Sequence, residues 1–360
     1  MDFFERLKQY QEQVENELQA LFVEKTNEAE TYENEVQKSI TVVKDFVLRG
    51  GKRIRPILVL LGYKCITHEE NPEILRAGLC TELMHAYFLI HDDIMDSSLL
   101  RRGKPTVHKQ WEKWAEANLP RLESSNFIKL GENMAILSGD LLENYAIEVL
   151  TRRDLPPERI RAALLKYCEI VQRVNIGQFL DTVIGEKPIT AATEDIINTI
   201  QLLKTAVYTI EGPLELGALL AGASEQQLII LSDYGQKVGI AFQIQDDILG
   251  LFGDEAETGK DALSDLREGK KTLLILKAVE NGSPEQQKRI LSALGQPDIS
   301  FSDLQDVRTI VKETGSLEFS KKRVSTLISE ATMTIKNSGF DSDSIELLVA
   351  FADFIGSRKY

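Results

Sequence analysis

The sequence predicts an all-α protein, and three observations support this fold class. Apolar residues recur at the three- and four-residue spacing of amphipathic helices along most of the 360 residues. No segment shows the sustained alternation of apolar and polar residues that marks a half-buried strand. Gly, Pro and polar residues gather in short breaks between the helical stretches, as turn chemistry requires. Roughly ten or more helices of ordinary length fit between these breaks.

The clearest helical patterns, in chain order, cover residues 53–65, 162–174, 196–210 and 345–356. Breaks rich in Gly and Pro separate the helices at 49–53, 69–73, 101–106, 152–159, 184–190, 220–227, 280–286 and 295–300. No break is long or polar enough to be a linker, and no internal repeat is present, so we expect one domain over residues 1–360. The weakest pattern lies at 109–130, where we expect a helical excursion on the surface.

Composition restricts the class of protein. No apolar run reaches the length of about 18 residues that a membrane span needs, and the net charge of -14 disfavours nucleic acid as a partner. The charged N-terminal stretch lacks the features of a signal or transit peptide, which favours a cytoplasmic location. Cys65, Cys80 and Cys168 are far apart in sequence and are expected to be reduced core residues. The expectation is a soluble cytoplasmic protein.

Three aspartates follow the apolar run "LMHAYFLI" in "HDDIMD". Helical geometry places the carboxylates of Asp92 and Asp96 on one face, one turn apart. Carboxylate oxygens, completed by water and phosphate oxygens, are the ligands that Mg²⁺ prefers. The alternative is a solvated acidic helix face, but acids on a largely buried helix need cations or hydrogen-bond partners. The pattern therefore favours a cation site.

A second acidic pair, Asp246 and Asp247, follows another apolar helical run. Two aspartate-bearing helices can face each other across a cavity. The basic clusters "GGKRIRP" at 50–56 and "LLRRGK" at 99–104 stand out in an acidic protein. Such local positive charge indicates a small anionic ligand in a confined site.

Together these motifs resemble the trans-isoprenyl diphosphate synthases, short-chain prenyltransferases related to farnesyl and geranylgeranyl diphosphate synthases. The resemblance rests on "GGKRIRP", "HDDIMDSSLLRRGKPTVH", "GQFLD", "KTAVY" and "FQIQDDILGLFGD" followed by "TGKDALSDLREGKKT", in the family's order. It implies the type I isoprenoid synthase fold, in which antiparallel helices surround a deep central cavity with one aspartate motif on each side of its mouth. It also implies a homodimer.

The resemblance assigns roles around the diphosphate of the allylic substrate. It implies that Asp92 and Asp96 coordinate two Mg²⁺ ions and Asp246 a third, and it includes the neighbouring Asp93 and Asp247 among the metal-binding carboxylates. Metal and cations would stabilise the departing diphosphate while the allylic carbon-oxygen bond breaks. The remaining residues implied to hold or line this diphosphate site are Arg101, Lys204, Thr205, Tyr208, Gln243 and Lys260. Asp92, Asp96, Asp246 and Lys204 are the residues expected to act directly in catalysis.

The second substrate, isopentenyl diphosphate, needs an anion site of its own. The family's positions for this site match Lys52, Arg55, His85 and Arg102. Arginine forks suit diphosphate oxygens, whereas a histidine on an apolar helix is equally compatible with a core role. The resemblance implies that the released diphosphate removes the final proton, so no dedicated base is expected.

One position departs from the family pattern. The second motif commonly ends in a third aspartate, but Gly250 stands there in "DDILG". Because the first aspartate of that motif is the principal ligand, we expect weaker support for the third metal ion rather than loss of activity.

Product length depends on what blocks the cavity below the first motif. Tyr87 and Phe88 precede Asp92 by five and four residues, roughly 6 to 7.5 Å along a helix. Spacing alone aims only Phe88 near the face of Asp92, whereas the family implicates both positions. This pattern favours farnesyl diphosphate as the product, with geranylgeranyl diphosphate second, unless both rings only pack the core.

Two other functions remain open from the sequence. A class I terpene cyclase also ionises allylic diphosphates but has no use for an isopentenyl diphosphate site. A noncatalytic regulatory subunit of a prenyltransferase typically loses the aspartate motif, whereas Asp92, Asp93 and Asp96 are intact here. Both features favour the synthase.

Overall fold

The computed structural model describes residues 3–121, 123–253 and 263–357. Helices dominate this part of the chain, which confirms the predicted all-α class. The first half contains α1 (Phe3–Ala29), α2 (Asn34–Val47), α3 (Ile54–Lys64), α4 (Pro72–Met95), β1 (Leu100–Arg101), β2 (Lys104–Pro105), α5 (Val107–Asn118), α6 (Ser124–Thr151) and α7 (Pro157–Gly185). The second half contains η1 (Ile189–Ala191), α8 (Glu194–Ile200), η2 (Gln201–Glu211), α9 (Gly212–Ala221), α10 (Glu225–Phe252), α12 (Ser264–Arg267), α13 (Leu273–Asn281), α14 (Pro284–Ala293), α15 (Phe301–Glu313), α16 (Ser316–Lys336) and α17 (Ser342–Ser357).

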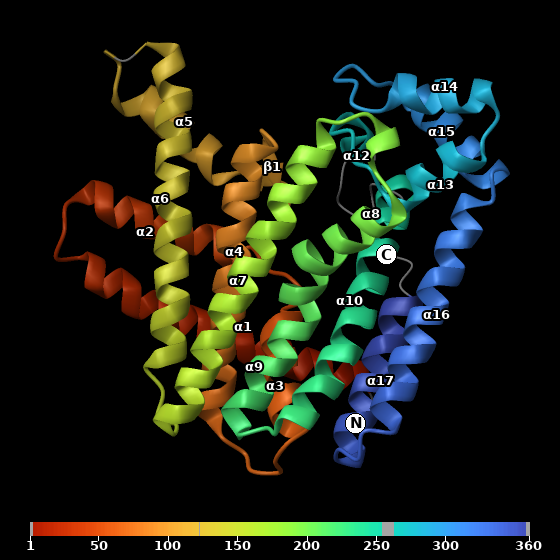
Figure 1. The fold of residues 1–360 in the computed structure, drawn as a ribbon. Coiled ribbons are helices and arrows are strands. Elements are labelled where there is room, and N and C mark those ends of the chain that lie inside the picture. Colours follow the sequence, from red (N-terminus) through yellow and green to blue (C-terminus); the bar gives the residue numbers. More distant parts are fainter. Residues whose placement is uncertain (1–2, 122, 254–262, 358–360) are drawn as a thin grey trace.

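The long helices form a bundle in which α4, α6, α7, α10 and α16 run roughly alongside one another (Figure 1). The most extensive packing joins α4 to α6, α10 to both α16 and η2, α3 to α9, and α5 to α6. The short helices α12 to α15 gather at one end of the bundle, the upper end in Figure 1. No helix in the described ranges is long and apolar enough to cross a membrane.

The two aspartate motifs lie near the C-terminal ends of two well-capped helices. The side chain of Asn71 accepts the backbone N–H of Glu73 at the start of α4, and Pro72 occupies the first turn, where its missing N–H has no cost. At the start of α10, Ser224 and Gln227 form a capping box. Both motifs are thereby placed about six turns from a fixed helix start.

The segment between the first motif and α6 is more firmly anchored than expected. Residues 107–118 form α5, and the side chain of Trp111 is fully buried against the bundle, with its ring 5.4 Å from that of Trp114. The expected surface excursion is therefore a packed helix over this range. Cys65 and Cys80 are buried as predicted, whereas Cys168 is exposed on α7, so its assignment to the core was wrong. Helical periodicity does not fix which face a borderline residue takes.

The predicted helix over residues 196–210 differs from an ordinary α-helix. It begins as α8, continues as the π-helical segment η2 and passes into α9 without a break. Segment η2 packs against both α7 and α10. At Gly177 of α7, an added Cβ would lie 2.6 Å from the backbone nitrogen of Lys204, so only glycine permits this close approach. π-Helical turns are uncommon and often occur at functional sites.

Candidate active site

The first aspartate motif ends α4 with the geometry that the spacing predicts. Asp92 is half-buried and accepts a 3.3 Å hydrogen bond from Nε2 of Gln178, while Nζ of Lys204 lies 3.8 Å from the same carboxylate. Asp96 is the C-cap residue and is exposed at the helix end. Partial desolvation, followed by repulsion from Asp92, raises the pKa of Asp96 to about 6. These two acids sit close enough to repel each other.

The side chain of Asp93 has a different partner from those of Asp92 and Asp96. It is buried and forms an ion pair with Arg101, which donates to its Oδ1 through two guanidinium nitrogens. Its other oxygen, Oδ2, is buried without a hydrogen-bond partner among the described residues. Desolvation raises the pKa of Asp93, although Arg101 opposes the shift. The sequence grouped Asp93 with the metal-binding acids, but the fold joins it to Arg101.

Helix α7 supplies a carboxylate whose role the sequence reasoning missed. Nζ of Lys204 donates a 2.6 Å hydrogen bond to Oδ2 of Asp181, one turn from Gln178 on the same helix. Desolvation opposes the charge of Lys204, but Asp92 and Asp181 outweigh it and raise its pKa. Lys204 is thus a fixed cation beside the first motif. Both α7 residues belong to "GQFLD", a stretch that was visible in the sequence without an assigned contact.

In the second motif, two amide side chains donate hydrogen bonds to the carboxylate of Asp247. Asp247 accepts a 2.7 Å hydrogen bond from Nε2 of Gln243 and a 3.3 Å bond from Nε2 of Gln201. Thr205 Oγ1 donates to Oε1 of Gln243 at 2.8 Å, which fixes the amide orientation. Desolvation, followed by repulsion from Asp265, raises the pKa of Asp247 to about 8. Asp246 is half-buried beside it.

Within the described ranges, no three acidic, histidine or cysteine side chains come close enough together to hold a metal ion by themselves. The carboxylates instead end two separate helices, with oxygen as the only donor type. Such a site can hold a hard divalent cation only if water or ligand oxygens complete its coordination.

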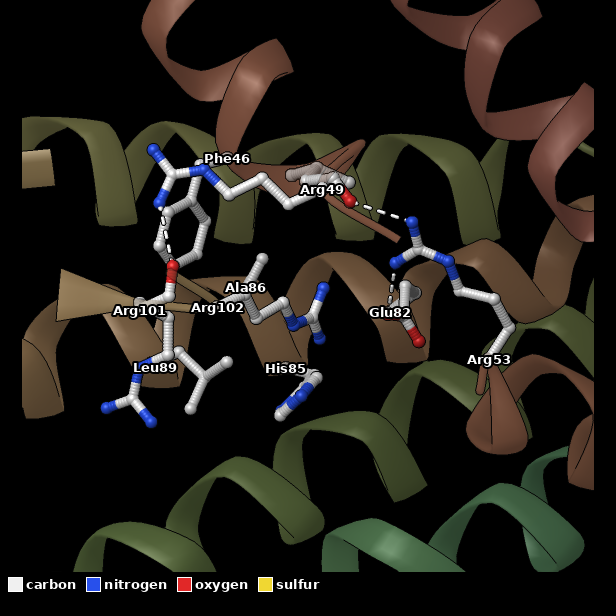
Figure 2. Close-up of a pocket in the computed structure, with 10 residues that line it drawn as sticks. Phe46, Arg49, Arg53, Glu82, His85, Ala86, Leu89, Arg101 and Arg102 are labelled. Carbon is white, nitrogen blue, oxygen red and sulfur yellow. Dashed lines mark hydrogen bonds and ion pairs between the residues drawn. The ribbon is translucent and has the colours of Figure 1, made fainter. Parts of the chain in front are cut away.

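A pocket rich in arginine lies beside α4 (Figure 2). Its lining residues are Phe46, Val47, Arg49, Arg53, Glu82, His85, Ala86, Leu89, Arg101 and Arg102. Three of its four guanidinium groups are paired with carboxylates, Arg49 with Asp45, Arg53 with Glu15 and Glu82, and Arg101 with Asp93. Arg102 donates to a backbone carbonyl instead, and a guanidinium in this position suits an anion with several oxygens, to which it can donate two parallel hydrogen bonds.

Arg53 fixes one wall of this pocket, and the sequence reasoning had not assigned it. Its backbone adopts φ +50° at the N-cap of α3. The buried side chain donates to Glu82 at 2.6 Å, to Glu15 at 2.7 Å and to the Val47 carbonyl at 2.8 Å. These carboxylates occupy Arg53, so it acts as a structural anchor rather than as an open anion donor.

Arg102 and His85 remain oriented toward the pocket interior. In Figure 2 the Arg102 side chain extends toward Glu82 and His85, and one of its nitrogens donates to the Gly50 carbonyl. Desolvation, only partly offset by Glu82, lowers the pKa of Arg102, and nearby arginines lower it further. Desolvation and then Arg55 and Arg102 hold the pKa of His85 well below its usual range. His85 is therefore neutral, and its buried Nδ1 has no partner among the described residues.

The other residues predicted for this anion site lie outside the pocket lining. The guanidinium of Arg55 lies 4.4 Å from the ring centroid of Tyr208 and donates to Oγ1 of Thr209 at 2.9 Å. Nζ of Lys52 lies 5.3 Å from the Phe354 ring. The fold therefore joins His85, Arg101 and Arg102 around one pocket, and Lys52 and Arg55 are not part of its lining. The predicted ligand Lys260 lies outside the described residues.

The two aromatic residues before the first motif face different neighbours. The ring of Phe88 lies 5.5 Å from that of Tyr208 on η2, in an edge-to-face arrangement. The ring of Tyr87 lies 4.9 Å from that of His91, and its hydroxyl interacts with Asn175 on α7. Phe88 thus points toward the same segment as Lys204, whereas Tyr87 points toward α7.

Comparison with known proteins gives consistent matches. Residues 37–313 match the family "Polyprenyl synthetase". The chain is 35% identical to the geranylgeranyl diphosphate synthase of Sulfolobus acidocaldarius over 266 residues, which covers 73% of this chain and 74% of the relative. It is 34% identical to a short chain isoprenyl diphosphate synthase of Methanocaldococcus jannaschii, covering 92% of this chain and 93% of the relative.

The fold matches a solved structure equally well. The geranylgeranyl pyrophosphate synthase of Corynebacterium glutamicum, complexed with isoprenyl diphosphate and magnesium, superposes with a TM-score of 0.91 and 32% identity. The match covers 99% of this chain and 100% of that protein. It confirms the predicted type I isoprenoid synthase fold, whereas the deep central cavity stays a prediction. These matches do not favour a terpene cyclase.

Proposed function

Since this chain belongs to the polyprenyl synthetase family and is a trans-prenyltransferase, we propose that it condenses isopentenyl diphosphate with allylic diphosphates to give farnesyl and geranylgeranyl diphosphate. The observation that carries the proposal is the pairing of two anion-binding regions. Asp92 with Lys204 forms one, and the arginine-rich pocket containing Arg102 and neutral His85 forms the other. Two diphosphate substrates require two such regions.

The first region fits a divalent metal, because its acids carry only oxygen donors and a cation would stabilise the charge of the partly dehydrated Asp96 beside Asp92. Asp92 and Asp96 would hold two Mg²⁺ ions and Asp246 a third. When bound, these ions would neutralise the charge that develops on the departing diphosphate. Asp93 and Asp247 have hydrogen-bond partners already and would support this site from behind.

The protein's own cations would hold the allylic diphosphate beside the metal. Lys204 is fixed by Asp181 and Arg101 by Asp93, so neither side chain needs to be ordered when the substrate binds. Thr205 and Gln243, joined to each other, and Tyr208 would line the same side from η2 and α10. This preorganised charge favours ionisation of the allylic carbon-oxygen bond.

The second region would hold isopentenyl diphosphate. Arg102 and the neutral His85 face the pocket, and Lys52 and Arg55 would contribute from outside its lining. The double bond of isopentenyl diphosphate then attacks the allylic cation, forming the new carbon-carbon bond, and the released diphosphate accepts the proton that is lost. No side chain has to act as the base.

The length of the product depends on the space below Asp92. Phe88 packs against Tyr208 and supports a short product, whereas relatives named for geranylgeranyl diphosphate support a longer one. We propose geranylgeranyl diphosphate as the end product, with farnesyl diphosphate also released. Phe88→Ala should lengthen the product by at least one isoprene unit if this ring is the floor. An unchanged product distribution would remove Phe88 from that role.

We also propose an oligomeric state and a cellular location for this protein. Large apolar side chains are exposed on α6 and α7, and they are Ile128, Ile136, Leu137, Leu165, Ile176, Phe179 and Val183. Three of the α7 residues recur at helical spacing, and Phe179 is 75% exposed, so this face supports a symmetric dimer of one-domain chains. Light scattering should give the mass of a dimer, and Phe179→Asp should give a monomer. We also propose a cytoplasmic location.

Purified protein incubated with isopentenyl diphosphate and, separately, dimethylallyl, geranyl and farnesyl diphosphate tests the function. Magnesium-dependent products of fifteen and twenty carbons are expected, and chelation with EDTA should abolish them. A folded protein that consumes an allylic diphosphate without isopentenyl diphosphate would be a cyclase. One that elongates no primer would fit a regulatory subunit.

A further inference from the structure

The hairpin of β1 and β2, which carries Arg101 and Arg102, is too short to be stable by itself. Its strands contribute two residue pairs, and Arg102 and Gly103 form the turn between them with φ values of +54° and +71°. An isolated two-stranded hairpin is marginally stable at best in water, and a positive φ is unfavourable for a residue with a side chain. Contacts from outside the hairpin therefore have to stabilise it.

The last turn of α2 and the residues that follow it supply such contacts. Nη1 of Arg49 donates a 3.3 Å hydrogen bond to the backbone carbonyl of Arg101, drawn as a dashed line in Figure 2. Lys104 is the residue opposite Arg101 in the hairpin, and its Nζ donates a 3.1 Å hydrogen bond to Oδ1 of Asp45. Both members of one hairpin pair are thus attached to the same end of α2.

Asp45 joins the two attachments into one network. Its Oδ2 accepts hydrogen bonds from Nη2 and Nε of Arg49 at 2.9 and 3.1 Å, while its Oδ1 accepts the bond from Lys104. Desolvation disfavours the charge of this carboxylate, but hydrogen bonds from Arg49 and Lys104 outweigh it and lower the pKa of Asp45. The Arg49 side chain is 2% exposed, and its guanidinium lies 5.2 Å from the ring centroid of Phe46. Carboxylate, ring and carbonyl together hold this guanidinium in place.

The hydrogen bonds of Arg49 separate its role from that of Arg102. Both residues line the arginine-rich pocket, but each of the three guanidinium nitrogens of Arg49 already donates to Asp45 or to the hairpin. Arg102 donates to the backbone carbonyl of Gly50, an uncharged acceptor that a diphosphate oxygen can replace. Arg49 is therefore suited to hold the hairpin, and Arg102 to bind the anion.

We propose that Arg49 and Asp45 are positioning residues that hold the hairpin so that Arg102 reaches isopentenyl diphosphate. This inference rests on the proposed function and deepens it. The affinity for this substrate then depends on two residues of the α2 end that do not bind it themselves. The allylic site should depend on them much less, because Asp93 holds the Arg101 side chain independently.

Asp45→Ala distinguishes this role from a simple effect of charge. If only the electrostatic field of the pocket mattered, loss of a nearby negative charge would tighten the binding of an anion. If the network positions Arg102, the same substitution should weaken binding, because Arg49 and Lys104 lose the carboxylate that joins them. Alanine is a better helix former than aspartate, so α2 itself should stay folded.

Calorimetric titration of the full-length protein with isopentenyl diphosphate, in EDTA and without an allylic substrate, measures this affinity without catalysis. We expect a Kd about tenfold higher in Arg49→Met, which keeps an apolar stem over Phe46, and about threefold higher in Asp45→Ala. Arg49→Lys keeps the charge but lacks the planar fork that serves both partners, so it should recover little of the loss. In steady-state assays, the KM for the allylic primer should stay within about twofold in each variant.

Arg76→Met is the matched control, because Arg76 on α4 pairs with Glu17 and Glu24 of α1 instead. Its Kd for isopentenyl diphosphate should equal that of the wild type, even where its melting temperature falls as far as that of Arg49→Met. Should Arg49→Met fail to fold, the sign of the change in Asp45→Ala still decides.

Three results would overturn the inference. These are a wild-type Kd in Arg49→Met or Arg49→Lys, unchanged or tighter binding in Asp45→Ala, and an equal loss of affinity in Arg76→Met. Each leaves the proposed function intact, provided that the wild-type protein binds isopentenyl diphosphate and elongates primers. A wild-type protein that does neither removes the proposed function instead.

Discussion

The two aspartate motifs share a residue pattern but are held by different chemistry. At the end of α4, Asp93 is paired with Arg101, and Asp92 lies beside Lys204. At the end of α10, Asp247 accepts hydrogen bonds from two neutral amides. Among the described contacts, the partners of the first motif are cations, whereas those of Asp247 are neutral amides. The same residue pattern is therefore held in two different ways.

The largest expected effect on kcat comes from removing an acid of the first motif, and the same change in the second motif should have a smaller effect. Asp92→Asn removes a charge shared by the proposed metal site and Lys204, and should lower kcat about 10³-fold, whereas Asp246→Asn should lower it about 10²-fold. Steady-state kinetics at saturating Mg²⁺ measures the difference, and thermal melts check that both variants fold. Equal losses would mean that the two motifs contribute alike.

Removing Lys204, the cation beside the first motif, should have the second largest effect. Lys204→Gln leaves Asp92 and Asp181 without their shared lysine, and we expect about a 10²-fold loss of kcat/KM for the allylic substrate. The KM for isopentenyl diphosphate should change little. Lys166→Gln serves as a comparison, because Lys166 pairs with Glu169 and Glu215 elsewhere on α7 and α9. An equal loss in both would argue for a general charge effect.

A smaller effect tests whether the arginine pocket serves the other substrate. Arg102→Lys keeps the charge but loses the planar fork, so the KM for isopentenyl diphosphate should rise about tenfold. The KM for the allylic primer should stay within about twofold. Initial rates with each substrate varied in turn give both values, and the opposite pattern would place Arg102 with the first motif.

The smallest effect concerns the amides of the second motif. Gln243→Leu removes the nearest donor to Asp247 and the acceptor for Thr205, and should lower kcat about threefold to tenfold. Added Mg²⁺ should restore part of the loss, because a cation can replace the missing donor. Measurement of rate against Mg²⁺ concentration shows this shift. A loss as large as that in Asp92→Asn would contradict the inequality of the motifs.

The local features of the site were predictable from sequence, because they depend on spacing along one helix. The four-residue spacing of Asp92 and Asp96 placed both at one helix end. The pairing of Asp93 with Arg101 was not predictable, because it depends on how the chain turns after α4, where Ser97 adopts a left-handed backbone conformation. Contact across a turn depends on its backbone conformation.

The sequence by itself determined the all-α fold, the family and the two acidic helix ends, since periodicity and motif order are properties of the chain. Only the tertiary structure decided which side chains meet. Lys204 joins Asp181 from η2 to α7, and Arg53 joins Glu82 from α3 to α4. These contacts connect separate helices, and helix packing sets their geometry, which no local pattern encodes.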